Sequence, residues 1–337
     1  MSFKRLDPED FVVSADAVQS TAWSTGDPTL TFFYTSSVQK QGSSGQYYLS
    51  VYQTGSTETT ATVQFDLVYG DKGGSGSVPY NSGIPDKTPS STMYGSYRSL
   101  ILEDENADFV FGDGANTYTS ENFYLLSVER ARYKEKLFPG TFNLHLSGPD
   151  GDLVHLTDNS NDVLTQTFLG SNRVIQIVSG SNGSAVADTA GGYVTDSGSY
   201  GLFFPDIGTI MLNPTALGVV KLNANRTGGT DGLNNATIYQ ALVDASYFQL
   251  NSQETITSDY IFVNTKASEF NYSENPSFIS GSTGEVIFDD FINNPQTYIT
   301  TTGLYNDSNE LLAVAKLSRP LLNDFTKALL IRAKLDF

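Results

Sequence analysis

Residues 297–317 read TYITTTGLY, NDSNE and LLAVAKL in succession, and residues 329–337 read LLIRAKLDF. The first and third runs are rich in β-branched and apolar residues and flank a short cluster of turn formers, a pattern typical of a β-hairpin. In the closing run the apolar residues alternate, so Leu329, Ile331, Ala333, Leu335 and Phe337 fall on one face of a strand. This spacing predicts a strand over 329–337 with one buried face.

Working outward from this stretch, the rest of the chain has the composition of a β-protein. The 337 residues are 39% hydrophobic and 12% aromatic, which excludes a disordered chain, and they include 30 Gly and 19 Tyr. β-rich runs at 30–38, 46–54 and 60–69 recur about every ten residues. We therefore predict a mainly β protein with antiparallel sandwich or barrel-like sheets, long Gly/Ser-rich loops and one or two short helices.

Changes in composition suggest four regions. Residues 1–70 form an N-terminal β region, and residues 71–170 a β region with a hairpin at 141–157. Residues 171–235 are a loop-rich excursion, because Ser179–Gly201 is almost entirely small and polar. Residues 236–337 combine a helix with a C-terminal sheet. Residues 1–170 and 236–337 could instead share one core.

Charge and residue content argue against several classes of function. The net charge of −18 argues against nucleic acid as the main partner, because phosphate binding needs clustered cations. The absence of cysteine excludes disulfides, thiolate nucleophiles and zinc–thiolate sites. The N-terminus has no apolar segment of a signal peptide, and no window is long and apolar enough to span a membrane. We expect a protein made and folded in the cytoplasm, without a cofactor.

The only two histidines, His145 and His155, lie on the expected hairpin at 141–157. Across the strand pair they would face each other, close enough to bind a metal together. Two ligands do not make a site, so a cross-strand polar pair is the favoured interpretation. The glycines of 70–77 lack the Lys-Ser/Thr pair of a phosphate-binding loop, and acidic pairs are expected by chance among 37 acids. We expect no metal, no catalytic residue and no enzyme activity.

One constellation of charge stands out. Residues 122–136 look like a strand, in which Arg130, Arg132, Lys134 and Lys136 would project from one face. Four cations in line, in an acidic chain, suggest a docking stripe for an acidic partner. The alternative is a solvated strand face whose cations are neutralised by acids on a neighbouring strand.

Two segments resemble proteins of known particles. Residues 298–307, YITTTGLYND, followed by 310–318, ELLAVAKLS, are similar to a segment of the baseplate and fibre-attachment proteins of contractile-tailed, myovirus-type bacteriophages, a group that includes cyanophages. The run from Asp10 to Ser24 resembles structural proteins of large marine phages of the myovirus type. The resemblance implies a virion protein that is assembled in the host cytoplasm, in several copies, against other virion proteins.

Three hypotheses of function follow. The first is a non-enzymatic structural protein of the tail baseplate or fibre-attachment region. The second is a receptor- or glycan-binding tail protein or a capsid decoration protein, because Tyr/Asn/Gly-rich loops could stack on sugars. The third is a tail-associated glycan hydrolase, for which the sequence offers no site.

Overall fold

The computed structural model describes residues 4–36, 48–77, 83, 87–227, 234–272 and 275–336. The protein is mainly β, with a large curled antiparallel sheet and three short α-helices in these ranges, which confirms the predicted fold class. Contacts divide the chain into a large unit, residues 18–254, and a terminal unit, residues 1–17 with 255–337. Phe337 and parts of the predicted strands at 30–38 and 46–54 lie outside the described residues.

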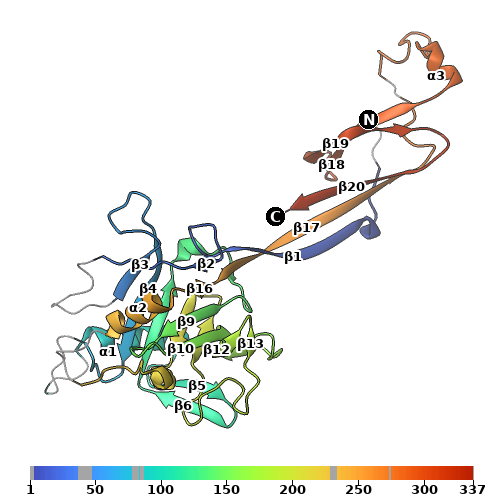
Figure 1. Cartoon of the computed structure of the whole chain (residues 1–337). Coiled ribbons are helices and arrows are strands. Elements are labelled where there is room, and N and C mark those ends of the chain that lie inside the picture. The colour runs from blue at the N-terminus through green and yellow to red at the C-terminus, as the bar shows by residue number, and fades with distance from the viewer. Residues whose placement is uncertain are drawn as a thin grey trace. The chain divides into compact units, whose positions relative to one another are not determined.

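The large unit is built on the curled sheet (Figure 1). Ten strands follow one another across it in the order β2 (Thr29–Leu30), β16 (Phe248–Gln249), β9 (Asn143–Ser147), β10 (Leu153–Asp158), β12 (Asn172–Ser181), β14 (Gly201–Phe204), β15 (Thr209–Leu212), β7 (Asn122–Val128), β4 (Val63–Asp71) and β3 (Tyr48–Tyr52). Two short strands, β11 (Thr167–Leu169) and β13 (Ser184–Ala185), pair with β12. Residues 171–235, where the sequence predicted a loop-rich excursion, thus supply three of the ten strands.

Strand alternation gives this sheet two buried faces. In β7, Tyr124 and Leu126 belong to one hydrophobic cluster, while Phe123 and Leu125 belong to another. Successive side chains of a strand point to opposite faces, so a strand covered on both sides reads as a continuous apolar run. Burial of each large apolar side chain contributes about 1.5–3 kcal/mol, and the central strands carry most of these residues.

The first helix covers one face of the sheet. In α1 (Pro89–Ile101) the Thr88 hydroxyl accepts a hydrogen bond from the Ser91 backbone at 3.4 Å, and proline occupies the first turn. Tyr94 stacks on Phe123 of β7, with ring centroids 5.5 Å apart. The hairpin of β5 (Phe109–Asp113) and β6 (Asn116–Ser120) contributes to the same cluster.

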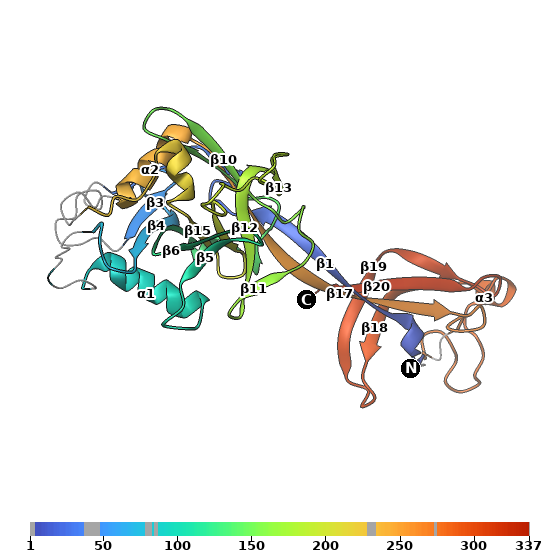
Figure 2. The same cartoon turned by 90° about the horizontal axis from the view of Figure 1, so that it is seen from below.

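The second helix, α2 (Asn234–Ala245), covers the other face through Ile238 and Leu242. Figure 2 shows α1 and α2 on opposite sides of β4. Four further elements are short: β8 (Lys136–Leu137) and the 3-10 helices η1 (Pro8–Asp10), η3 (Arg130–Arg132) and η4 (Ala216–Val220).

The terminal unit contains long strands and one short helix. Two of its strands, β1 (Phe11–Thr21) and β17 (Asn251–Thr265), continue into the large unit. The other three are β18 (Thr297–Tyr305), β19 (Leu311–Asn323) and β20 (Leu329–Asp336). Its α-helix is α3 (Asp289–Asn293). The sheet order is β1-β17-β20, whereas β18 and β19 form a separate hairpin. β17 pairs with β20 from Ser258↔Asp336 to Thr265↔Leu329.

Both predicted hairpins are confirmed. β9 and β10 pair from Asn143↔Thr157 to Ser147↔Leu153, and β18 pairs with β19 around the predicted turn. The alternation predicted for the last strand is also confirmed: Ile331 and Ala333 are buried, while Leu330 is exposed. These buried residues belong to neither of the two hydrophobic clusters.

Candidate functional site

The basic residues at 130–136 do not form the predicted row, because the strand that would align them ends early. β7 ends at Val128, Arg130–Arg132 form a 3-10 helix, and β8 holds only Lys136 and Leu137. The reason lies in the apolar residues between the cations. Tyr133 and Leu137 are buried in the hydrophobic cluster that includes Tyr124, and the backbone turns to place them there.

The chain itself provides partners for three of these cations. The Arg130 guanidinium lies 4.6 Å from the centroid of the Tyr133 ring and donates to the Tyr133 carbonyl at 2.6 Å. The Lys134 ammonium lies 3.8 Å from Glu254, and that of Lys136 lies 3.4 Å from Glu135. The straight stripe is therefore wrong as a description of their geometry. A role for Arg130, Arg132, Lys134 and Lys136 at an interface stays a prediction.

The two histidines lie directly opposite each other, as the predicted hairpin requires. Their rings stack with centroids 3.9 Å apart and planes 13° apart, and Tyr247 stacks on the other side of His145 at 4.2 Å. Burial, and then the neighbouring His155, lowers the pKa of His145 to about 4. A shared metal would need ring nitrogens whose in-plane lone pairs converge, which parallel stacked rings do not provide.

A groove of about 560 Å³ lies beside the outermost ring of this stack. It is lined by His155, by the apolar side chains of Leu153, Val186 and Val219, and by Ser179, Ser181 and Ser184. The strands β12 and β13 at its edge are joined by Asn182 and Gly183, whose φ angles of 51° and 80° are those of a two-residue hairpin turn. The groove therefore combines an imidazole, apolar surface and hydroxyl groups.

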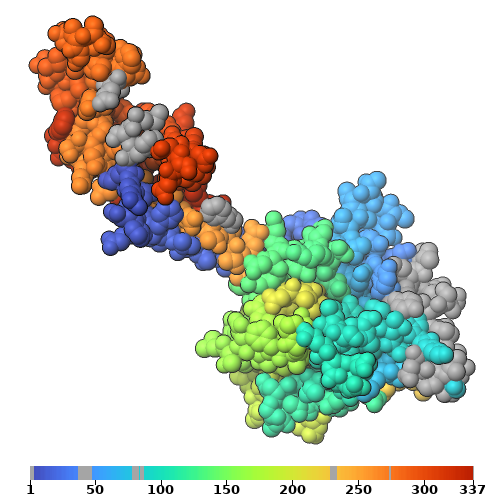
Figure 3. Space-filling view, turned by 180° about the vertical axis from the view of Figure 1, so that it is seen from behind, coloured from blue at the N-terminus to red at the C-terminus, as the bar shows by residue number. Residues whose placement is uncertain are grey.

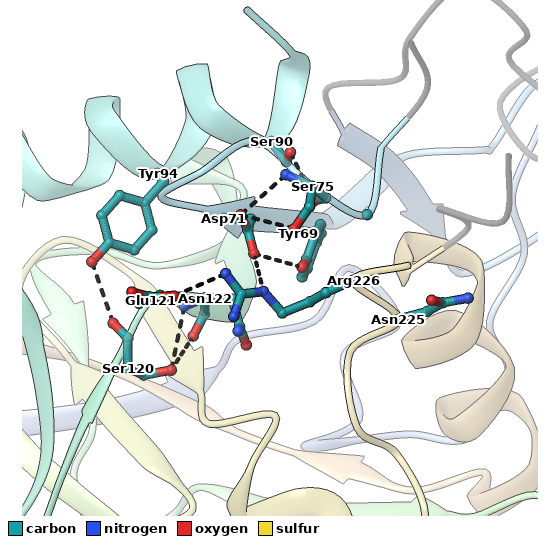
Figure 4. Close-up of polar contacts among 12 residues, drawn as sticks. Tyr69, Asp71, Ser75, Ser90, Tyr94, Ser120, Glu121, Asn122, Asn225 and Arg226 are labelled. Carbon is teal, nitrogen blue, oxygen red and sulfur yellow. Dashed lines mark hydrogen bonds and ion pairs between the residues drawn. The ribbon is translucent and has the colours of Figure 1, made fainter. Parts of the chain in front are cut away.

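A buried ion pair lies at the end of β4 (Figure 4). The carboxylate of Asp71 is fully buried; one oxygen accepts from Ser75, at 3.1 Å from the backbone nitrogen and 3.2 Å from the hydroxyl. The other accepts from Arg226 Nε at 2.7 Å and from the Tyr69 hydroxyl at 3.3 Å. Arg226 also donates to Glu121 at 3.0 Å.

This network joins three segments of the chain. Burial, and then the charge of Asp71, raises the pKa of Tyr69, so the phenol keeps its proton and donates to the carboxylate. A buried carboxylate is stable only when it is paired and hydrogen-bonded. Both oxygens of Asp71 are engaged within the chain, so we interpret the network as a structural tie between β4, the start of β7 and the segment before α2.

Large apolar side chains are exposed along the strands of the terminal unit and around its helix α3. Leu312 and Val314 of β19 are 68% and 58% exposed. Other exposed examples are Phe11, Val12, Val13, Ile287, Phe288, Ile292, Tyr298, Leu311 and Leu330. In the space-filling view the orange and red atoms of this unit form a narrow body that is open to solvent on the visible side (Figure 3). Among its described hydrophobic residues only Ile261, Ile331 and Ala333 are buried.

The sequence located the hairpin that carries this surface but not the surface itself. Both faces of 311–317 contain apolar residues, so periodicity alone does not say which face stays uncovered. The stacking of Tyr247 and the pairing of Asp71 with Arg226 were also missed, because each joins residues about a hundred or more positions apart.

Comparisons with known proteins give no relative: no family model matches the chain, and neither curated proteins nor solved structures yield a match. Within the described ranges, no helix is long and apolar enough to cross a membrane. Among the same residues, no three His, Cys, Asp or Glu side chains are grouped to hold a metal ion.

Proposed function

We propose that the chain is a non-enzymatic structural component of a bacteriophage virion, in the tail baseplate or the fibre-attachment region, and that it acts through protein–protein interfaces. The observation that carries this proposal is the surface of the terminal unit. Its long strands expose many large apolar side chains, whereas soluble monomers rarely expose large contiguous apolar patches.

The arrangement of these strands supports an interface. β18 and β19 form a two-stranded hairpin, and an isolated hairpin of this kind is marginally stable in water. The edges of such hairpins and of the β1-β17-β20 sheet present unpaired backbone groups that can pair with another chain. A partner that covers these strands would remove apolar surface from water and pair the edges.

The virion assignment itself rests on the resemblance to contractile-tail proteins. The segment that carries it, 298–318, coincides with β18, its turn and most of β19. The second resembling segment, from Asp10 to Ser24, contains β1, which also exposes apolar residues. The segments that resemble virion proteins are thus largely those that need a partner.

The test is to locate the chain in intact particles. A particle preparation from the virus that encodes it should contain the protein in stoichiometric amount by mass spectrometry. Cross-links should join the terminal unit to neighbouring tail proteins, and a map of the tail should contain its density. Purified particles that lack the protein would overturn the assignment.

The groove beside His155 favours a second candidate, a receptor- or glycan-binding tail protein or a capsid decoration protein. An imidazole face, apolar walls and three serines suit a neutral sugar ring, which needs both stacking and hydrogen bonds. A glycan array probed with the wild-type protein and with His155→Ala tests it. Binding that is lost in the variant would favour this function, and the absence of binding would remove it.

A further inference from the structure

Charge is strongly segregated in the last 71 residues of the terminal unit. Residues 267–310 contain seven acidic residues and no Lys or Arg, whereas residues 311–337 contain five basic and two acidic residues. The acids of the first segment are Glu269, Glu274, Glu285, Asp289, Asp290, Asp307 and Glu310, and the bases of the second are Lys316, Arg319, Lys327, Arg332 and Lys334. In a chain with 37 acids and 19 bases, a net positive segment is unusual.

The positive segment presents a mixed apolar and basic surface on β19, here called the basic hairpin surface: Leu312, Val314, Lys316 and Arg319. Val314 and Lys316 occupy alternate positions and so share one face of the hairpin. Leu312 lies at a shift of register between the two strands and is also exposed. Val314 pairs with Gly303 and Lys316 with Thr301, and the side chains of Tyr305 and Leu311 lie over Gly303 beside Val314. Arg319 lies in the bulged stretch that follows and is exposed.

The negative segment presents a matching surface at α3, here called the acidic tip: Ile287, Phe288, Asp289, Asp290 and Ile292. Its three apolar side chains are each more than half exposed, and both aspartates are exposed. The tip has a defined shape, because Phe278 packs on Phe288 and Phe291 with ring centroids 6.0 and 4.8 Å apart.

Within the described part of the chain, neither surface is paired with a surface of opposite charge. Among the ion pairs of the described residues, none joins Asp289 or Asp290 to a cation, and none involves Lys316 or Arg319. The basic hairpin surface has one lysine and one arginine beside exposed Leu and Val, and the acidic tip has two aspartates beside exposed Ile and Phe. The two surfaces are therefore complementary in charge, and both offer apolar side chains for burial. Complementary potentials of this kind fix register and suppress wrong partners.

We propose that the acidic tip of one copy of this chain docks on the basic hairpin surface of a second copy. The self-docking names the partner of the exposed hairpin, and its role in a virion rests on the proposed function. The two surfaces differ, so the contact either forms twice across a two-fold axis in a dimer or repeats head to tail, closing into a ring or continuing as a fibre.

The experiment uses the full-length chain, with its mass of 36.5 kDa, in sedimentation or light scattering over a range of concentrations. The wild type should form oligomers, and higher salt should weaken them. Lys316→Glu with Arg319→Glu, and separately Asp289→Lys with Asp290→Lys, should each weaken self-association by about tenfold or more. All four side chains are exposed, so the thermal melting of each variant should match the wild type.

Mixing the two charge-reversed variants gives the decisive result. Each copy of one variant then meets an opposite charge on the other, so the mixture should assemble when neither variant assembles alone. A control, Lys87→Glu with Lys221→Glu, makes the same change of net charge as Lys316→Glu with Arg319→Glu, but at exposed positions of the large unit, and should associate like the wild type. Loss of association in this control, or no rescue on mixing, would overturn the proposed contact.

The two proposals fail in different ways. A wild type that stays monomeric up to about 100 μM overturns the self-docking, while its presence in particles would keep the structural role with another virion protein as partner. A chain that self-associates through these surfaces but is absent from particles overturns the virion assignment alone.

Discussion

The two units use the same strand patterns with opposite results. In the large unit, alternating side chains of β7 and β15 enter two hydrophobic clusters, whose members all lie between Ala22 and Leu250. In the terminal unit, β19 alternates equally well, yet Leu312 and Val314 remain in water. The difference teaches that alternation defines faces, while covering elements decide whether a face becomes a core. The large unit supplies its own cover in α1 and α2, and we infer that other protein chains cover the terminal unit.

The largest expected effect is the loss of a central aromatic ring from the large unit. Phe248 contacts Trp23, Phe65 and Phe142, with ring centroids 4.8, 5.4 and 5.9 Å away. Phe248→Ala should lower the free energy of unfolding by about 3–5 kcal/mol, because it removes buried surface and leaves a cavity. Urea unfolding measures this change.

The matched control for that variant is Leu330→Ala on the exposed side of β20. It should change the free energy of unfolding by no more than about 0.5 kcal/mol, because the side chain is already in water. If both variants lose a similar amount of unfolding free energy, the exposed side of β20 contributes as much to stability as the core of the large unit, and the contrast between the units fails.

The buried ion pair should give the next largest effect. Arg226→Met leaves the Asp71 carboxylate fully buried without its cation and should cost about 3 kcal/mol. This is the low end for a broken buried pair, because the Arg226 side chain is 41% exposed and already partly solvated. Urea unfolding of the variant checks the value.

The second substitution Asp71→Asn should then recover part of the loss, because it removes the uncompensated charge. If the losses of unfolding free energy from the two substitutions simply add, Asp71 and Arg226 are not coupled. Their ion pair then contributes little to the stability of the large unit.

The sequence predicted those elements whose signals are local. The two hairpins and the alternation in β20 depend on turn formers and period-2 spacing. The strands β14 and β15 are only four residues long and lie next to a stretch of small polar residues, so composition hid them. They pair with each other as a hairpin, but the ladders that join them to β12 and β7 connect distant parts of the chain, and tertiary context decides such short strands.

The predictions of site residues were also right where local pairing decides the geometry and wrong where distant contacts decide it. The pairing of His145 with His155 follows from a short hairpin and was predictable. The row from Arg130 to Lys136 failed because Tyr133 and Leu137 enter the core, which bends the backbone. The partner of Asp71 lies 155 positions away, and no local pattern connects the two residues.

Acid should weaken the large unit through His145. Its folded-state pKa of about 4 is below the ordinary value of 6.5, so as pH falls through 6.5 the unfolded chain takes up a proton that the folded chain refuses. Stability is therefore lost between about pH 6.5 and pH 4. We expect a loss of about 1 kcal/mol in the free energy of unfolding. This is well below what the whole pKa shift of His145 would give, because the ring is only partly buried and solvent screens the charge.

The measurement compares unfolding free energies at pH 7 and pH 5 for the wild type and His145→Phe, which keeps an aromatic ring in the stack but cannot titrate. The variant should lose less stability than the wild type over this interval. An identical pH dependence in both proteins would remove His145 as the source.

The smallest expected effect on the main unfolding transition comes from a buried residue of the terminal unit. Ile331 is 4% exposed and pairs with Val263, but neither residue belongs to the two hydrophobic clusters. Ile331→Ala should therefore shift the main thermal transition by no more than about 1 °C, although it removes about 2 kcal/mol or more of local stabilisation. That local loss should appear as faster amide hydrogen exchange along β17 from Ser258 to Thr265. The matched variant Ile177→Ala, at a fully buried position of β12, should lower the same transition by roughly 5 °C or more. If both variants lower the main transition equally, the two units unfold as one cooperative structure, and the terminal unit does not depend on a partner for its stability.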